Sequence, residues 1–144
     1  MKQMPVLIQV SDIQEVNGQT ETIELFSNGL FSQHEADSNT WSLCYHEHDD
    51  EHSCNKTTLT NHNGQIMLSR EGDFPLAFIF EEGIRHNGMY HTPYGPVDLG
   101  IYSNSVAFVS DDCGGVVTIA YTVNINTDLL SMHKMIISFH YLSR

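Results

Sequence analysis

The residues best suited to chemistry lie in one polar segment, from Cys44 to Cys54. Between these two cysteines stand His46, His48 and His52, together with several carboxylates. Imidazole and thiolate are good ligands for Zn²⁺ or Ni²⁺, and carboxylates can complete such a site. We therefore consider His46, His48 and His52 as candidate metal ligands. The alternative is a solvated, charged hairpin loop, because polar loops of this kind commonly hold no ligand.

The chain has none of the short signatures that mark common enzyme classes. It contains no G-x-S-x-G elbow, no Walker phosphate loop and no dinucleotide-binding fingerprint. Nine histidines and eighteen carboxylates make chance pairs unavoidable, so the sequence alone nominates no general base. The sequence therefore favours a protein that is not an enzyme, and we expect no cofactor.

Composition limits the range of partners. The 144 residues include 18 acidic and 6 basic side chains, which gives a formal net charge of −12 with neutral histidines. The basic residues are scattered, whereas nucleic acids and anionic membranes bind clustered Lys and Arg, so we expect neither partner. Three cysteines at irregular spacing indicate reduced thiols. No stretch is apolar enough for a signal peptide or a bilayer-spanning helix, so we expect a cytoplasmic protein.

Turn signals indicate the architecture that must position these residues. Asn-Gly is the strongest short-range hairpin signal, because both residues tolerate a positive φ. This dipeptide occurs at residues 17–18, 28–29, 63–64 and 87–88, and weaker turn signals occur at residues 71–73, 93–96, 104–105 and 112–115. Their spacing predicts a chain of antiparallel hairpins, arranged as a barrel or a sandwich.

Between the turns, apolar and polar residues alternate as they do in β-strands. In residues 117–125 the apolar side chains share one face, and small or polar side chains share the other. That second face fits either the inside of a narrow barrel or a solvated outer surface. Residues 129–141 fit a helix or a strand, and the two adjacent isoleucines at 136–137 favour a strand. We predict nine or ten strands, no helix and one domain covering residues 1–144.

Several short motifs follow the order typical of one bacterial family. They are Tyr45 with Glu47, Thr57–Leu59, Ile66–Leu68 with Arg70 and Gly72, Tyr90–Gly95 followed by Val97, Leu99 and Ile101, and Gly115–Tyr121. In these motifs the chain resembles the YwiB family of uncharacterised bacterial proteins over nearly its whole length. The resemblance implies a lipocalin-like, calycin-type antiparallel barrel of about eight strands, and it implies no activity. The polar loop at residues 46–54 departs from the family's pattern, so no role for it is carried over.

Taken together, the turns and the resemblance predict an all-β, up-and-down antiparallel barrel of about eight to ten strands. The interior of such a barrel is either packed or holds one small ligand. We predict that Arg70 and Tyr90, with Tyr102 and Tyr121, line a pocket for a small anionic or amphipathic ligand. Arginine would supply a forked cation and the tyrosines amphipathic walls. The alternative is that Arg70 closes a barrel end by pairing with a carboxylate, while the tyrosines are core residues.

Three classes of function stay open. A small-molecule-binding barrel requires a closed wall around a deep void. A protein-interaction module, present as a monomer or a homodimer, requires a filled interior and a large exposed apolar patch. A small enzyme requires a polar cleft in which acids and bases converge.

Overall fold

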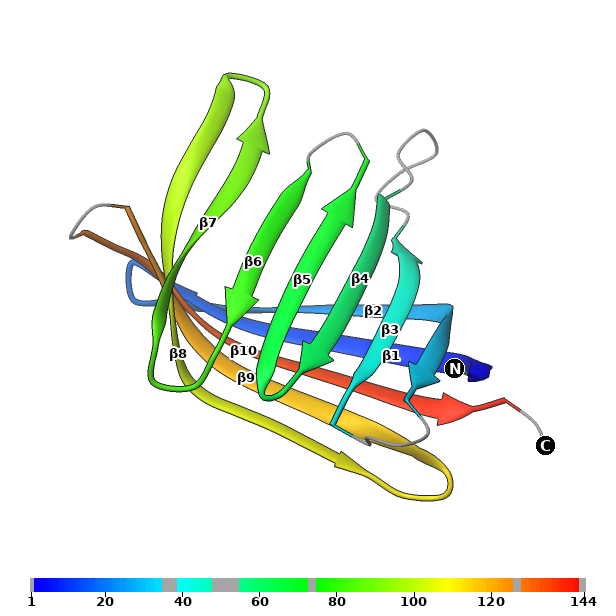
Figure 1. The fold of residues 1–144 in the computed structure, drawn as a ribbon. Coiled ribbons are helices and arrows are strands. Elements are labelled where there is room, and N and C mark those ends of the chain that lie inside the picture. Colours follow the sequence, from blue (N-terminus) through cyan, green and yellow to red (C-terminus); the bar gives the residue numbers. More distant parts are fainter. Residues whose placement is uncertain (1, 35–38, 48–54, 73–74, 126–127, 143–144) are drawn as a thin grey trace.

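The chain folds into one closed antiparallel barrel. The structure is a computed structural model, and it describes residues 2–34, 39–47, 55–72, 75–125 and 128–142. Each strand pairs with its neighbour in sequence, and β1 pairs with β10 to close the barrel (Figure 1). The ten strands are β1 (Lys2–Val16), β2 (Gln19–Gln33), β3 (Trp41–Glu47), β4 (Asn55–His62), β5 (Gln65–Glu71), β6 (Leu76–Phe80), β7 (Arg85–Thr92), β8 (Gly95–Ser110), β9 (Gly114–Ile125) and β10 (Asp128–Tyr141). The predicted all-β, up-and-down barrel is confirmed, and so is the choice of a strand for the last segment. Among the described residues, no helix is long and apolar enough to span a membrane.

Two of the four Asn-Gly dipeptides form hairpin tips. The φ angles are 53° at Asn17 and 79° at Gly18, between β1 and β2. They are 54° at Asn63 and 86° at Gly64, between β4 and β5. Positive φ at both central residues is the requirement of a type I′ turn, so these two predictions are confirmed.

The other two Asn-Gly dipeptides lie inside strands, so the prediction of turns there was wrong. Gly29 is part of β2 and Gly88 is part of β7. A methyl group on Gly29 would overlap the carbonyl oxygen of Cys44 and the side chain of Ile8, and one on Gly88 would overlap the ring of Phe78. Glycine is required at both positions because neighbouring atoms approach the backbone closely.

Two β-bulges interrupt the long strands. In β8 the register with β9 shifts between Ser103 and Ser105, and in β10 the register shifts between Leu129 and Ser131. The turn predicted at residues 104–105 is therefore a bulge within β8. A bulge inserts one residue and bends its strand, which changes the direction in which nearby side chains point.

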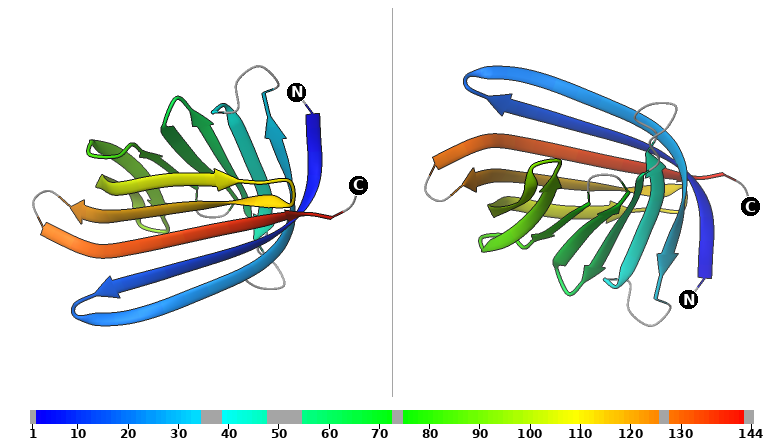
Figure 2. Two further views of the ribbon diagram at one scale, coloured as in Figure 1. Left: turned by 90° about the horizontal axis from the view of Figure 1, so that it is seen from below. Right: turned by 90° about the horizontal axis from the view of Figure 1, so that it is seen from above.

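The barrel has one wall of short strands and one wall of long strands. The short strands are β3 to β7, and the long strands β1, β2, β8, β9 and β10 run at an angle to them (Figures 1 and 2). The first residues of β1 and the last residues of β10 lie at the same end of the molecule (Figure 2). In β9 the apolar residues point into the barrel, so its small and polar face is the outer surface.

Aromatic side chains fill one end of the interior. The ring centroids of Phe31 and Phe139 are 4.4 Å apart, and those of Trp41 and Phe108 are 4.7 Å apart. Phe31, Trp41 and Phe139 are fully buried. Among the described residues this end is therefore a packed aromatic core.

Candidate functional site

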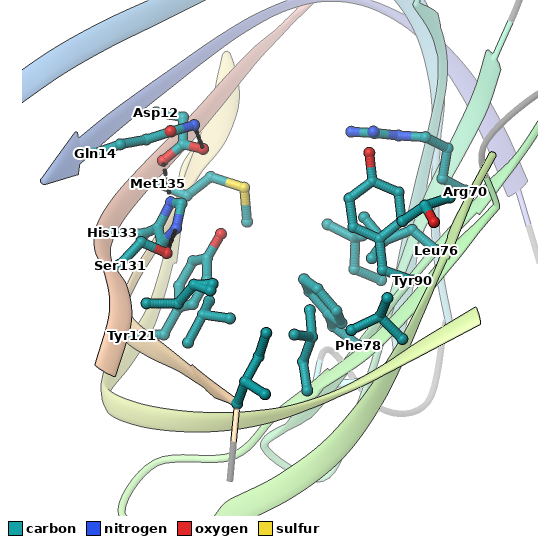
Figure 3. A pocket seen from close by; sticks show the side chains of 17 residues that line it. Asp12, Gln14, Arg70, Leu76, Phe78, Tyr90, Tyr121, Ser131, His133 and Met135 are labelled. Atoms are coloured by element: carbon teal, nitrogen blue, oxygen red, sulfur yellow. Dashed lines mark hydrogen bonds and ion pairs between the residues drawn. The ribbon is translucent and has the colours of Figure 1, made fainter. Parts of the chain in front are cut away.

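A cavity of about 430 Å³ opens at the end of the barrel opposite the aromatic core. Seven strands contribute to it, since its lining residues come from β1, β5, β6, β7, β8, β9 and β10. Most of the lining is apolar, and polar groups lie on two facing sides (Figure 3). A concave, mostly apolar pocket with a few polar groups is the usual form of a small-molecule site. The lining residues are Asp12, Gln14, Leu68, Arg70, Leu76, Phe78, Tyr90, Thr92, Val97, Leu99, Tyr121, Val123, Ile125, Leu130, Ser131, His133 and Met135.

Three of the four residues predicted to bind a ligand line this cavity. Arg70 and Tyr90 lie on one side, and Tyr121 faces them from the other (Figure 3). Arg70 follows Ile66 and Leu68 in the alternation of β5, so its side chain enters the barrel where that strand ends. The guanidinium extends toward the cavity, where it can meet a bound molecule (Figure 3).

The fourth predicted residue, Tyr102, lies elsewhere. It is 38% exposed and follows Ile101 in β8, whose side chain is buried in the core. Successive side chains in a strand point to opposite faces, so Tyr102 is on the outside of the barrel. It therefore does not join Arg70, Tyr90 and Tyr121 at the cavity.

Tyr121 supplies a neutral hydrogen-bond donor to the cavity. Burial raises the pKa of its phenol well above the ordinary value of 10, and the nearby Asp12 carboxylate raises it further. Arg70 acts in the opposite direction but does not offset these two effects. The hydroxyl points into the cavity and keeps its proton at neutral pH (Figure 3).

The wall facing Arg70 carries a hydrogen-bonded chain of polar side chains. Ser131 Oγ lies 2.7 Å from His133 Nε2, and His133 Nδ1 lies 3.3 Å from Asp12 Oδ1. Gln14 Nε2 donates a hydrogen bond of 3.1 Å to the other oxygen of Asp12. The His133 ring stacks on Tyr121, with centroids 4.7 Å apart and planes 3° apart. These contacts hold the imidazole on three sides (Figure 3).

With Asp12 ionised and His133 neutral, these contacts admit one arrangement of the protons. An ionised carboxylate only accepts hydrogen bonds, so Nδ1 of His133 must donate to Asp12. In a neutral imidazole the other nitrogen, Nε2, is then an acceptor, and Ser131 donates its hydroxyl proton to it. The side chains of His133 and Asp12 are only 12% and 22% exposed, which limits competition from water.

Sequence reasoning missed these residues, although strand alternation could have found them. On β1 the inward positions run Met4, Val6, Ile8 and Val10, and the next two are Asp12 and Gln14. On β10 the inward series of Phe139, Ile137 and Met135 continues to His133 and Ser131. In both strands apolar side chains give way to polar ones at the cavity end.

One of the three predicted metal ligands, His46, lies within the described residues. His46 is exposed on β3, where its backbone carbonyl accepts a 2.8 Å hydrogen bond from Ser27 Oγ. His48 and His52 lie outside the described residues. Within the described ranges no group of three His, Cys, Asp or Glu side chains is arranged to hold a metal ion. Metal binding by the loop stays a prediction, and a calorimetric titration with Zn²⁺ would test it.

Comparison with known proteins identifies relatives of the whole barrel. Residues 8–137 match the family described as "Domain of unknown function (DUF1934)". The "Uncharacterized beta-barrel protein YwiB" of Bacillus subtilis (strain 168) is 25% identical over 142 residues, which is 96% of each chain. The crystal structure of the ywiB protein from Bacillus subtilis matches with a TM-score of 0.84 at 22% identity, over 98% of this chain and 94% of that chain. Because the family match spans most of the chain, the protein belongs to the DUF1934 family of YwiB-like β-barrel proteins.

Proposed function

We propose that this barrel binds one small amphipathic molecule that carries an anionic group. The observation that carries the proposal is the apolar cavity of about 430 Å³ with the Arg70 guanidinium at its side. Its volume lies in the usual range for small-molecule sites. Leu68, Phe78 and Leu99 contribute apolar surface for the hydrophobic part of the molecule.

Arg70 supplies a cation that can recognise an anionic group at one side of the cavity. The Asp12 carboxylate lies on the opposite wall, where it accepts hydrogen bonds from Gln14 and His133. Arg70 presents a planar set of donors that matches a carboxylate, sulfonate or phosphate. The Tyr121 phenol adds a neutral donor across the cavity. An anionic head group near Arg70 and an apolar body among the leucines and Phe78 satisfy both kinds of surface.

Two fluorescent probes of similar shape separate charge recognition from simple apolar binding. Anilinonaphthalene sulfonate carries an anionic group, and N-phenyl-1-naphthylamine lacks it. A hydrogen bond to a charged group contributes about 1.5–3 kcal/mol, so Arg70→Ala should weaken sulfonate binding about 10- to 150-fold. The same substitution should change the affinity for the neutral probe by less than about threefold, because the apolar lining is retained.

Arg85→Ala is the matched control. Arg85 is exposed on β7 and lies over Gly100, and it does not line the cavity. This variant should bind both probes as the unmodified protein does. Equal sulfonate affinities for Arg70→Ala and Arg85→Ala would contradict the proposal. If Arg70→Ala weakened the binding of both probes equally, Arg70 would contribute to the shape of the cavity and not to recognition of the charge.

Native mass spectrometry of protein purified without a tag tests for a natural ligand. A bound anion of a few hundred daltons would support the proposal and give the mass of the ligand. The same spectrum reports whether the protein is a monomer or a homodimer.

A further inference from the structure

The chain from Asp12 through His133 to Ser131 goes beyond what anion binding requires. Arg70 lies on the opposite side of the cavity and needs no imidazole to hold an anion (Figure 3). The polar chain instead has the order found where a hydroxyl is activated as a nucleophile. There a carboxylate orients an imidazole, and the imidazole accepts the hydroxyl proton.

The distances fit this chemistry. The 2.7 Å between Ser131 Oγ and His133 Nε2 is a short hydrogen bond, suited to proton transfer. The 3.3 Å between His133 Nδ1 and Asp12 Oδ1 is longer, and it still places a carboxylate oxygen next to that nitrogen. The stacked Tyr121 ring fixes the plane of the imidazole, so Nε2 stays directed at Ser131.

Ser131 is also placed where a substrate can reach it. It lines the cavity beside Leu130, at the bulge that shifts the register of β10. Bulges bend a strand and redirect side chains, and they are frequent next to active sites. The protonated Tyr121 hydroxyl points into the same cavity and can donate to a carbonyl oxygen that gains negative charge (Figure 3).

We propose that Ser131 is the nucleophile of an acyl-transfer site that hydrolyses esters of apolar carboxylic acids. Ser131 Oγ forms a bond to the ester carbonyl carbon while its proton passes to His133 Nε2. The bond from that carbon to the alcohol oxygen then breaks, and the leaving oxygen takes the proton from His133. A water molecule next transfers a proton to His133 and bonds to the acyl carbon. The serine–acyl bond breaks, the proton returns to Ser131, and a carboxylic acid leaves.

In this step Ser131, His133 and Tyr121 are catalytic residues, and Asp12 is a positioning residue for His133. The product is a carboxylate with an apolar chain, which is the class of molecule proposed to bind at Arg70. The two proposals can nevertheless fail separately, because covalent labelling of Ser131 and reversible binding of anilinonaphthalene sulfonate are independent measurements. Unmodified protein that binds the sulfonate but resists labelling would overturn only the acyl-transfer site. Labelled protein without sulfonate binding would overturn only the proposed function.

An alkyl fluorophosphonate probe tests the nucleophile directly. We expect one covalent adduct in the intact mass of the unmodified protein, and peptide mapping should place it on Ser131. Ser131→Ala should abolish the adduct. His133→Gln should slow labelling by about 100-fold or more, the usual contribution of a general base. Ser103→Ala is the control, because Ser103 is a buried serine whose Oγ has no hydrogen-bond partner among the described residues.

The role of Asp12 is tested by rescue. Asp12→Asn should slow labelling by roughly tenfold or more, since the amide no longer selects the productive tautomer. Asp12→Glu should restore part of that rate, because it returns a carboxylate to the imidazole. Hydrolysis of p-nitrophenyl butyrate should follow the same order of variants. An unlabelled native protein, an adduct on another residue, or labelling that persists in Ser131→Ala would overturn the proposal.

Discussion

Gly29 is the position at which one added methyl group should test the packing of the barrel most sharply. A Cβ at this position would overlap the carbonyl oxygen of Cys44 on β3 and Cδ1 of Ile8 on β1, and it would lie 3.2 Å from Cβ of Tyr45. The first obstacle is backbone and cannot rotate away. The second is a buried side chain, since Ile8 is fully buried. We therefore expect Gly29→Ala to push β2 away from both neighbours.

Overpacking of this kind costs about 1–3 kcal/mol in the free energy of unfolding. The unfolding entropy is about 2.1 cal/mol/K per residue, which for 144 residues is about 0.3 kcal/mol/K. The expected decrease in Tm is therefore about 3–10 °C. Thermal and urea unfolding followed by circular dichroism would measure it. Asn28→Ala is the control, because Asn28 is exposed and the change removes atoms without adding any.

A double-mutant cycle with Ile8→Val tests whether overlap with Ile8 causes the loss of stability in Gly29→Ala. This change deletes Cδ1 of Ile8, the atom that the new methyl group would meet, and alone it should cost about 0.5–1.5 kcal/mol. Gly29→Ala should then cost at least about 0.5 kcal/mol less in the valine background than in the unmodified protein. Strict additivity, or a Gly29→Ala variant as stable as the unmodified protein, would refute this explanation of Gly29.

Three further outcomes are expected. Phe31→Ala should destabilise the barrel by about 3–5 kcal/mol in urea unfolding, because the ring is fully buried and stacks on Phe139; a loss below about 1 kcal/mol would contradict the importance of the aromatic end. Burial raises the pKa of Tyr121, so its contribution to stability is present below the phenol's ordinary value of 10 and is lost as the pH rises toward the folded-state value. Tyr121→Phe should therefore unfold less readily in alkali than the unmodified protein, and identical alkaline transitions would argue against this effect. Hydrogen bonds from His86 and Gln65 lower the pKa of Glu81, so the contribution of its carboxylate to stability is present above the ordinary value of 4.5 and is lost as the pH falls through the lowered value. Glu81→Gln should therefore make Tm less dependent on pH in that acidic range. An unchanged pH dependence of Tm would exclude this contribution of Glu81 to stability.

Local turn chemistry explains why the architecture could be predicted from the sequence. The residues Asn17 and Asn63 adopt the positive φ that their turns require, and these hairpins depend only on adjacent residues. The same dipeptide at residues 28–29 and 87–88 has a different cause, the close approach of atoms from other strands. Such contacts depend on the pairing of strands far apart in the sequence. The Asn-Gly dipeptide alone therefore does not distinguish a glycine in a turn from a glycine in a packed strand.

The site was predicted in part for a similar reason. Arg70 and Tyr121 follow apolar residues in strands with clear alternation, so their inward direction could be inferred. The same alternation in β8 places the side chain of Tyr102 outside the barrel, so it should have excluded Tyr102 from the predicted ligand-binding residues. The contact of Asp12 with His133 joins residues 121 positions apart, and only the register of β1 with β10 brings them together. No local pattern contains that information.

The pairing of β1 with β10 also affects how the protein is made. Strand β1 is synthesised before β10, and one edge of β1 stays uncovered until β10 is available, since Val6 pairs with Tyr141 and Glu15 with Met132. During that interval both margins of the incomplete sheet offer backbone donors and acceptors to other chains. The contacts that close the barrel also span the longest separations, which slows folding. Cells that synthesise this protein quickly should therefore need chaperones most during the interval before β10 is complete.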